Sequence, residues 1–155
     1  MKITVIAVGK TSTPEISRLI DGYLRRIGHY IGFELVELPD VRGCRDSESQ
    51  KRAEGDAILK RLTAADTVVL LDERGREMTS VEFARFLEGR MNAGIKRLVF
   101  IIGGPYGFSQ EVYSRADRLL GLSQMTFTHE MVRLFFTEQV YRAMTILRGE
   151  PYHHQ

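Results

Sequence analysis

The sequence of 155 residues contains only one cysteine, Cys44, and it contains no tryptophan. A single cysteine excludes an internal disulfide, and no cysteines and histidines occur at the spacing of a metal site. A catalytic thiol at Cys44 is a weaker interpretation than an ordinary cysteine in a polar loop. No apolar run approaches the ~18 residues that cross a bilayer. These absences predict a cytoplasmic protein that binds no metal.

Three common catalytic or nucleotide-binding motifs are also missing. There is no G-x-x-x-x-G-K-[ST] loop, which argues against a P-loop nucleotide triphosphatase. There is no G-x-G-x-x-G after the first expected strand, so the usual dinucleotide fingerprint is absent. The lack of a G-x-S-x-G nucleophile elbow weakens a hydrolase interpretation. Functional polar residues must therefore be sought elsewhere, above all in the C-terminal third.

Charge of one sign is not in large excess. The formal net charge is +2 and the pI is near 8.8, which permits an RNA partner without the strongly basic footprint of many nucleic-acid-binding domains. Basic residues do cluster locally, and the cluster members could contact phosphates or could simply be solvated side chains on surface helices and a loop. These residues are Arg25, Arg26, Arg42, Arg45, Lys51 and Arg52.

Apolar periodicity predicts one α/β domain over residues 1–155, with a mostly parallel sheet flanked by helices, because strand and helix patterns alternate five times. The polar stretch 39–50 is expected to be a mobile loop, and residues 73–78 a charged turn. Expected strands cover 2–8, 33–38, 67–71 and 98–102, with a short strand or extended loop at 122–127. Expected helices cover 14–27, 51–63, 80–91, 110–120 and 129–148.

The segment 98–108, Leu-Val-Phe-Ile-Ile-Gly-Gly-Pro-Tyr-Gly-Phe, is the most informative stretch. Its continuous apolar run is typical of a buried parallel strand, and a turn with three glycines follows directly. Ligands of open α/β sheets bind beyond the carboxyl ends of the strands. The pattern indicates either a small-molecule site near Gly103–Gly107 or a tight structural turn.

The last expected helix carries several polar residues with chemical potential. His129 and Arg133 are four residues apart and so share a helical face. Glu138 and Arg142 have the same spacing, and they form either a modest surface ion pair or part of a site. Tyr152 and the histidines after it lie at the chain end, where disorder is common.

Taken together, several segments closely resemble the bacterial ribosomal RNA large subunit methyltransferase H family, of the SPOUT class. The resemblance covers essentially the whole chain, and the combination is specific although no single motif is. It rests on residues 1–10, Tyr23-Leu24-Arg25-Arg26, Gly103-Gly104-Pro105-Tyr106-Gly107, Leu122-Ser123 through Met125-Thr126-Phe127, His129 with Arg133, residues 138–143, and Pro151-Tyr152-His153.

The resemblance implies a C-terminal trefoil knot, which no sequence argument would propose because knots are so rare. It also implies a homodimer that binds S-adenosylmethionine and methylates N3 of a pseudouridine in a hairpin loop of 23S rRNA, on the assembled ribosome. By position, the implied cofactor-binding residues are Leu71, Gly103, Leu122, Ser123, Gln124, Met125, Thr126 and Phe127. Those implied near the target base are His129, Arg142, Tyr152 and His153.

Methyl transfer to an imide nitrogen needs in-line positioning and loss of the N3 proton. His129 or His153 is the candidate base, and Arg142 the candidate group for stabilising the developing anion. In a dimer, one subunit's tail could complete the other subunit's site. His154 stands where the family often has a basic residue, which would make any phosphate contact there depend on pH.

Three alternatives remain at this point. A related methyltransferase could act on tRNA or on another rRNA base, and dependence on ribosomes would argue against it. A non-catalytic RNA-binding or ribosome-associated factor would fail to bind S-adenosylmethionine. A flavodoxin-like binding module would be yellow as purified.

Overall fold

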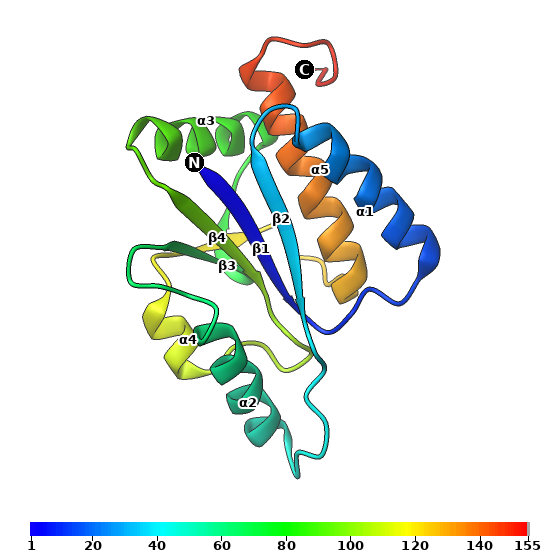
Figure 1. The fold of residues 1–155 in the computed structure, drawn as a ribbon, viewed down its shortest axis with the longest axis vertical. Coiled ribbons are helices and arrows are strands. Elements are labelled where there is room, and N and C mark those ends of the chain that lie inside the picture. The colour runs from blue at the N-terminus through cyan, green and yellow to red at the C-terminus, as the bar shows by residue number, and fades with distance from the viewer. Residues whose placement is uncertain (155) are drawn as a thin grey trace.

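In the computed structural model, which describes residues 1–154, strands and helices alternate along the whole chain (Figure 1). This alternation confirms the α/β class predicted from periodicity. The strands are β1 (Lys2–Val8), β2 (Gly32–Leu38), β3 (Thr67–Glu77), β4 (Arg97–Ile102) and β5 (Arg118–Gly121). The helices are α1 (Pro14–Ile27), α2 (Ser47–Leu59), α3 (Ser80–Asn92), α4 (Gln110–Arg115) and α5 (His129–Leu147).

All five strands form one parallel sheet in the order β2-β1-β4-β3-β5. Because the strands are parallel, their carboxyl ends and the loops that follow them gather at one edge of the sheet. That edge therefore brings together the turns after β1, β3, β4 and β5. The trefoil knot implied by the resemblance is not tested by this strand order and stays a prediction.

Alternate residues of the buried strands feed two separate cores, one on each face of the sheet. On one face, Phe100 of β4 packs against Phe136 of α5, with ring centroids 4.7 Å apart. On the other face, Ile101 belongs to a cluster with Ile58 of α2 and Val112 of α4. Helices α1, α3 and α5 thus cover one face, and α2 and α4 cover the other. This explains why β4 is apolar at every position from Leu98 onward.

Local sequence signals account for most helix starts. Pro14 occupies the first position of α1, where its missing N–H costs nothing. Thr79 and Glu82 form the capping box predicted from their spacing at the start of α3. Ser109 and Thr128 cap α4 and α5 through their side-chain oxygens. None of the helices in residues 1–154 has the length and apolarity needed to cross a membrane.

The predicted boundary of the 39–50 loop is wrong, because the helix after it begins earlier. Asp46 accepts a hydrogen bond from the backbone N–H of Ser49 at 2.7 Å, which starts α2 at Ser47 rather than near residue 51. The helix also ends at Leu59 rather than near residue 63. The polar composition of residues 46–50 reflects helix capping, not only a loop.

Two further predictions, on either side of β5, are wrong. The charged segment 73–78 is not a turn, because β3 continues to Glu77 and pairs again with β5 after a bulge. The helix expected up to residue 120 stops at Arg115, and Arg118–Gly121 form the edge strand β5. Gly75 makes this pairing possible, since a Cβ there would lie 2.5 Å from the backbone nitrogen of Leu120.

Candidate functional site

A cleft of about 470 Å³ lies at the carboxyl edge of the sheet, where the turns after β3 and β4 meet the start of α5. Leu71, Gly103, Thr126, Phe127 and His129 all line it, so five of the residues singled out by the resemblance converge in space. Its volume is within the range of small-molecule sites. The structure therefore places a ligand-sized cavity where the glycine turn predicted one.

The glycine loop, residues 103–107, forms one wall of this cleft. Gly107 has a φ of +79°, and its N–H donates to the carbonyl of Gly104 at 3.2 Å, which closes a tight turn. A Cβ on Gly103 would lie 3.1 Å from the ring of Phe108. Glycine at position 103 is therefore required by the packing of Phe108, whose ring also lines the cleft.

Glu54 of α2 supports the glycine loop from behind. Its side chain is buried, and Oε1 accepts a hydrogen bond from Gln50 Nε2 at 3.0 Å while Oε2 has no partner within residues 1–154. The carboxylate lies directly against Gly104, where a Cβ would come within 2.8 Å of Glu54 Cδ. The position of the glycine loop and that of α2 are thus fixed together.

We expect Gly104→Ala to displace either this buried carboxylate or the glycine loop. Overpacking of this kind costs about 1–3 kcal/mol of folding free energy, and the loop should also lose affinity for its ligand. Urea denaturation and calorimetric titration of S-adenosylmethionine measure the two effects. Gly89→Ala is the matched control, because a Cβ at Gly89 in α3 meets nothing within 4 Å. Equal stability and affinity of the two variants would contradict the role assigned to Gly104.

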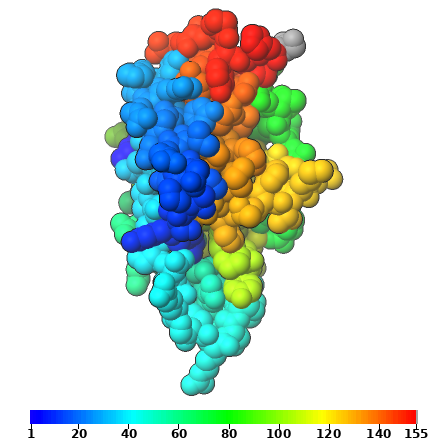
Figure 2. Space-filling view, turned by 90° about the vertical axis from the view of Figure 1, so that its right-hand side faces the viewer, coloured from blue at the N-terminus to red at the C-terminus, as the bar shows by residue number. Residues whose placement is uncertain are grey.

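The loop from Leu122 to Thr128 forms the opposite wall and stands out from the surface in Figure 2, in gold. Leu122, Ser123 and Met125 line a smaller hollow of about 110 Å³, which shares Leu71, Thr126 and Phe127 with the main cleft. The Oγ of Ser123 accepts the backbone N–H of Met125 at 3.0 Å. Gln124 is exposed and lines neither cavity. The predicted extended loop is confirmed, but its strand alternative is wrong.

An acidic group that sequence reasoning missed lies at the floor of the cleft. The Asp72 carboxylate is largely buried and accepts hydrogen bonds from the Arg74 backbone N–H at 2.8 Å and from the Tyr113 hydroxyl. Burial raises its pKa, but the bonds from Arg74 and Tyr113 outweigh burial and keep the pKa below its usual value. Burial, together with the bond to Asp72, raises the pKa of Tyr113 to about 12. Asp72 is therefore ionised near neutral pH and Tyr113 is not.

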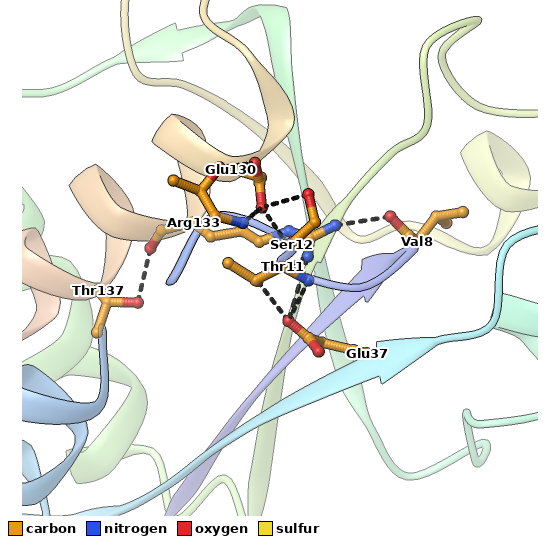
Figure 3. Close-up of polar contacts among 8 residues, drawn as sticks. Val8, Thr11, Ser12, Glu37, Glu130, Arg133 and Thr137 are labelled. Atoms are coloured by element: carbon orange, nitrogen blue, oxygen red, sulfur yellow. Dashed lines mark hydrogen bonds and ion pairs between the residues drawn. The ribbon is translucent and has the colours of Figure 1, made fainter. Parts of the chain in front are cut away.

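The first turn of α5 is tied to the loop after β1, as Figure 3 shows. Both Glu130 carboxylate oxygens accept hydrogen bonds from Thr13, the backbone N–H at 3.0 Å and the hydroxyl at 2.8 Å. The Ser12 N–H also donates to this carboxylate. These bonds hold the pKa of Glu130 below its usual value. Glu130 thus caps α1, a role that the Thr13 side chain does not fill.

Arg133 completes this connection from inside the protein. Its Nη2 donates to the Val8 carbonyl at 2.7 Å, and its Nη1 donates to Thr11 Oγ1 at 2.9 Å and to Glu37 Oε1 at 3.2 Å (Figure 3). Burial lowers the pKa of Arg133 while Glu37 opposes that shift. Its spacing from His129 predicted a shared helical face, but Arg133 does not line the cleft and instead anchors the end of β1.

A second polar cluster forms at the other end of α5, where the tail folds back on the helix. Arg142 Nη2 donates to Glu138 Oε1 at 2.5 Å, and the Tyr152 hydroxyl donates to the same oxygen at 3.0 Å. Arg142 Nη1 lies 3.3 Å from His153 Nδ1. The predicted Glu138–Arg142 pair is thus confirmed as part of a network. Burial, and then the contacts with Tyr23 and Glu138, raise the pKa of Tyr152 above its ordinary value, so the phenol stays protonated.

The tail is ordered by aromatic packing as well as by these polar bonds. The Tyr152 ring lies 4.7 Å from that of Tyr141, and Arg142 lies over the Tyr152 ring at 4.8 Å. The Tyr30 hydroxyl donates to Glu150 Oε2 at 2.5 Å. The general expectation of disorder at a chain end is therefore wrong for residues 149–153.

The four residues implied near the target base do not meet within one chain. Arg142, Tyr152 and His153 form the tail cluster, whereas His129 lies at the first position of α5. His129 and Arg142 are thirteen positions apart, which is roughly 20 Å along the helix. The structure therefore separates these predicted residues into two groups, one at the cleft and one at the tail.

Sequence signals existed for some of the residues that were missed. Asp72 follows a buried strand directly, which is a common position for a ligand-binding carboxylate in parallel sheets. Glu54 is an acidic residue on the buried side of its helix, but that side becomes clear only once Ile58 and Gly55 are known to be buried. Nothing in the sequence indicates that Tyr113 reaches Asp72. Among residues 1–154 no group of histidine, cysteine or carboxylate side chains could hold a metal.

Comparison with known proteins adds to this geometry. A family model described as predicted SPOUT methyltransferase matches residues 1–153. The chain is 55% identical over 157 aligned residues to the protein of Porphyromonas gingivalis named ribosomal RNA large subunit methyltransferase H, and all of both chains is covered. Proteins of the same name from Christiangramia forsetii and Flavobacterium johnsoniae are each 52% identical, also with full coverage of both chains.

Proposed function

The chain belongs to the SPOUT methyltransferase family, and we propose that it transfers a methyl group from S-adenosylmethionine to N3 of a pseudouridine in 23S rRNA, on the assembled ribosome. The cleft at the carboxyl edge of the sheet carries this proposal, because the glycine loop, the 122–127 loop and His129 converge there. The names of the curated relatives support a large-subunit rRNA substrate. The match over residues 1–153 supports a single methyltransferase domain.

The residues present fit S-adenosylmethionine as the methyl donor, which supplies an electrophilic methyl group on a positively charged sulfur. Leu71, Ile102 and Val132 give the cleft apolar surface, and Glu73 gives it negative charge beside a cationic ligand. The charge of Asp72 is paired with Arg74 at 3.2 Å. Gly103 lines the cleft without a side chain of its own, so a ligand beside it meets backbone. We propose that Leu71, Gly103 and residues 122–127 hold the donor.

We propose that His129 is the general base that accepts the N3 proton. The contact between Arg142 and His153 is the reason for choosing His129 over His153. A guanidinium group only donates hydrogen bonds, so His153 Nδ1 accepts from Arg142 and the neutral ring carries its proton on Nε2. His153 then presents an N–H to the substrate instead of a basic nitrogen. His129 lines the cleft and is exposed, so its ring is free to accept the proton.

The tail cluster has a different role in this proposal. Glu138 raises the pKa of Arg142 and fixes its side chain, so Arg142 stays charged and directed. Such a cation stabilises the imide anion that forms as N3 loses its proton. The neutral Tyr152 hydroxyl and the His153 N–H help to position the target pseudouridine.

Because the two groups of residues are roughly 20 Å apart along α5, we propose that two subunits form a homodimer in which the tail of one faces the cleft of the other. Exposed apolar side chains near the cleft support such an association. Met125 is 76% exposed and Phe135 is 40% exposed, and Phe127 packs against Phe135 at a centroid distance of 5.2 Å. A symmetric dimer interface would remove these apolar side chains from contact with water.

The decisive test is transfer of labelled methyl from S-adenosylmethionine to ribosomes isolated from cells that lack this gene. Ribosomes with and without pseudouridine in the target hairpin loop form the matched pair. We expect label only on large-subunit rRNA that contains pseudouridine. Label on tRNA instead, or equal label on both ribosome preparations, would sink the proposed substrate while leaving the family assignment in place.

A further inference from the structure

A second groove, of about 460 Å³, runs beside the donor cleft on the side of α2 and α4. The two cavities share one stretch of wall, formed by Arg74, Tyr106–Phe108 and Tyr113. A strand lying in the groove would therefore lead directly to the place where a target base must be presented. No residue of the donor and catalytic sets proposed above lines this groove.

Cations on α2 give the groove its chemical character. Arg52 is exposed on its wall, and no carboxylate of residues 1–154 lies within 4 Å of its guanidinium. Lys51 also lines the wall but pairs with Glu48 at 2.7 Å. Glu111 is the second acidic residue of the lining. Arg52 is thus the cation of the wall that is left free to meet an anion.

The surface that leads to the groove carries further free cations. Arg42 and Arg45 lie in the loop between β2 and α2, both exposed and both more than 4 Å from any carboxylate of the described chain. That loop and the start of α2, in cyan, form the tapering lower end of the molecule in Figure 2. From this end along α2 to Arg52 the chain carries four cations against three carboxylates, a small positive excess that can meet a phosphate backbone. The cations are Arg42, Arg45, Lys51 and Arg52, and the carboxylates are those of Asp40, Asp46 and Glu48.

An aromatic side chain stands where the groove meets the cleft. Tyr106 in the glycine loop is 52% exposed and lines both cavities. An exposed aromatic ring beside cations is the combination on which single-stranded bases stack. A buried structural tyrosine would not leave half of its surface in water.

We propose that this groove binds the phosphate backbone of the RNA strand that carries the target base, with Arg52, Arg45 and Arg42 meeting phosphates and Tyr106 stacking on a base. The inference rests on the proposed function, because it takes RNA as the substrate. Single-stranded loops are the form of RNA whose bases are splayed and free to stack. The strand then crosses from the groove into the cleft at Tyr106.

The test compares Arg52→Glu with Lys96→Glu, which makes the same charge reversal at the opposite edge of the sheet, just before β4. Methyl transfer to unmodified 70S ribosomes gives KM and kcat, and a fluorescent 12-nucleotide oligouridylate gives RNA affinity without turnover. We expect Arg52→Glu to raise the ribosome KM about 10-fold and to reduce the salt dependence of oligouridylate binding by roughly one phosphate contact. Affinity for S-adenosylmethionine and kcat stay unchanged.

Tyr106→Ala is expected to weaken oligouridylate binding about 10-fold by loss of stacking, with Tyr106→Phe retaining most of the affinity. If Arg52→Glu and Tyr106→Ala match Lys96→Glu in both assays, the groove does not bind the RNA. If the wild-type protein methylates no ribosome but Arg52→Glu still weakens oligouridylate binding, the proposed reaction fails and the groove stands.

Discussion

We expect His129→Ala and Arg142→Ala each to lose turnover when assayed alone, and an equal mixture of the two variants to recover part of it. Each substitution should lower kcat by about 10²–10⁴, since each removes proton transfer or charge stabilisation. The two residues lie roughly 20 Å apart along α5, so one composite site takes His129 from one subunit and Arg142 from the other. A heterodimer of the two variants then keeps one intact site out of two.

After exchange of subunits, half of the dimers are mixed, so the mixture should reach about a quarter of wild-type activity. Labelled methyl transfer to ribosomes measures the recovery. Mixing two preparations of His129→Ala with different tags is the control, because no dimer of that mixture holds an intact site. A mixture no more active than its components would contradict the composite site.

Alanine substitution of each histidine in turn distinguishes the two candidate catalytic bases, His129 and His153. If His129 is the base, His129→Ala should lower kcat by about 10²–10⁴, while His153→Ala, which removes only an N–H donor, should lower kcat far less. The reason is the hydrogen bond from Arg142, which holds His153 Nδ1 as an acceptor. Full turnover in both alanine variants would exclude histidine as the base at either position.

Arg133→Met is expected to cause the largest loss of stability. The substitution leaves the Val8 carbonyl without its donor and the Glu37 carboxylate without its ion pair, at 2.7 Å and 3.2 Å respectively. Removing one partner of such a buried network costs about 3 kcal/mol of unfolding free energy. Urea denaturation measures it, and Arg85→Met on the exposed side of α3 should change stability by no more than ~0.5 kcal/mol.

A double-mutant cycle separates the ion pair from the rest of the Arg133 contacts. Glu37→Gln in the Arg133→Met background removes the uncompensated charge and should restore part of the lost stability, while the amide oxygen still accepts from the Thr11 N–H. The expected coupling energy is about 1–2 kcal/mol. Strictly additive effects of the two substitutions would mean that the pair is not coupled.

Much of the fold followed from local patterns. The apolar run Leu98–Ile102 and the glycines after it located both the central strand and the cleft wall, because a buried parallel strand has few other readings. The capping spacing of Thr79 and Glu82 was equally direct. The residues implied at the donor site came from the resemblance, and all of them except Gln124 line one of the two adjoining cavities.

What failed was decided by contacts distant in sequence. Leu119 and Leu120 fit a helical stripe, but the edge position beside β3 made Arg118–Gly121 a strand. The charges of residues 73–77 resembled a turn, since an exposed strand extension carries no apolar alternation. The role of Asp72 depended on Tyr113, which lies 41 residues further along the chain. Single-sequence patterns do not contain such pairings.

The bonds that join α5 to the loop after β1 also set the order in which the protein can be completed. Glu130 reaches Ser12 across 118 residues of sequence, and Arg133 reaches Val8 across 125. Contacts of such separation form late and slow the folding of a chain. During synthesis, the turn that begins α1 must wait, uncapped, until the last helix has emerged from the translating ribosome. A nascent chain that stops before α5 therefore lacks one wall of the cleft, and it also lacks the hydrogen bonds that fix the end of β1 and the start of α1.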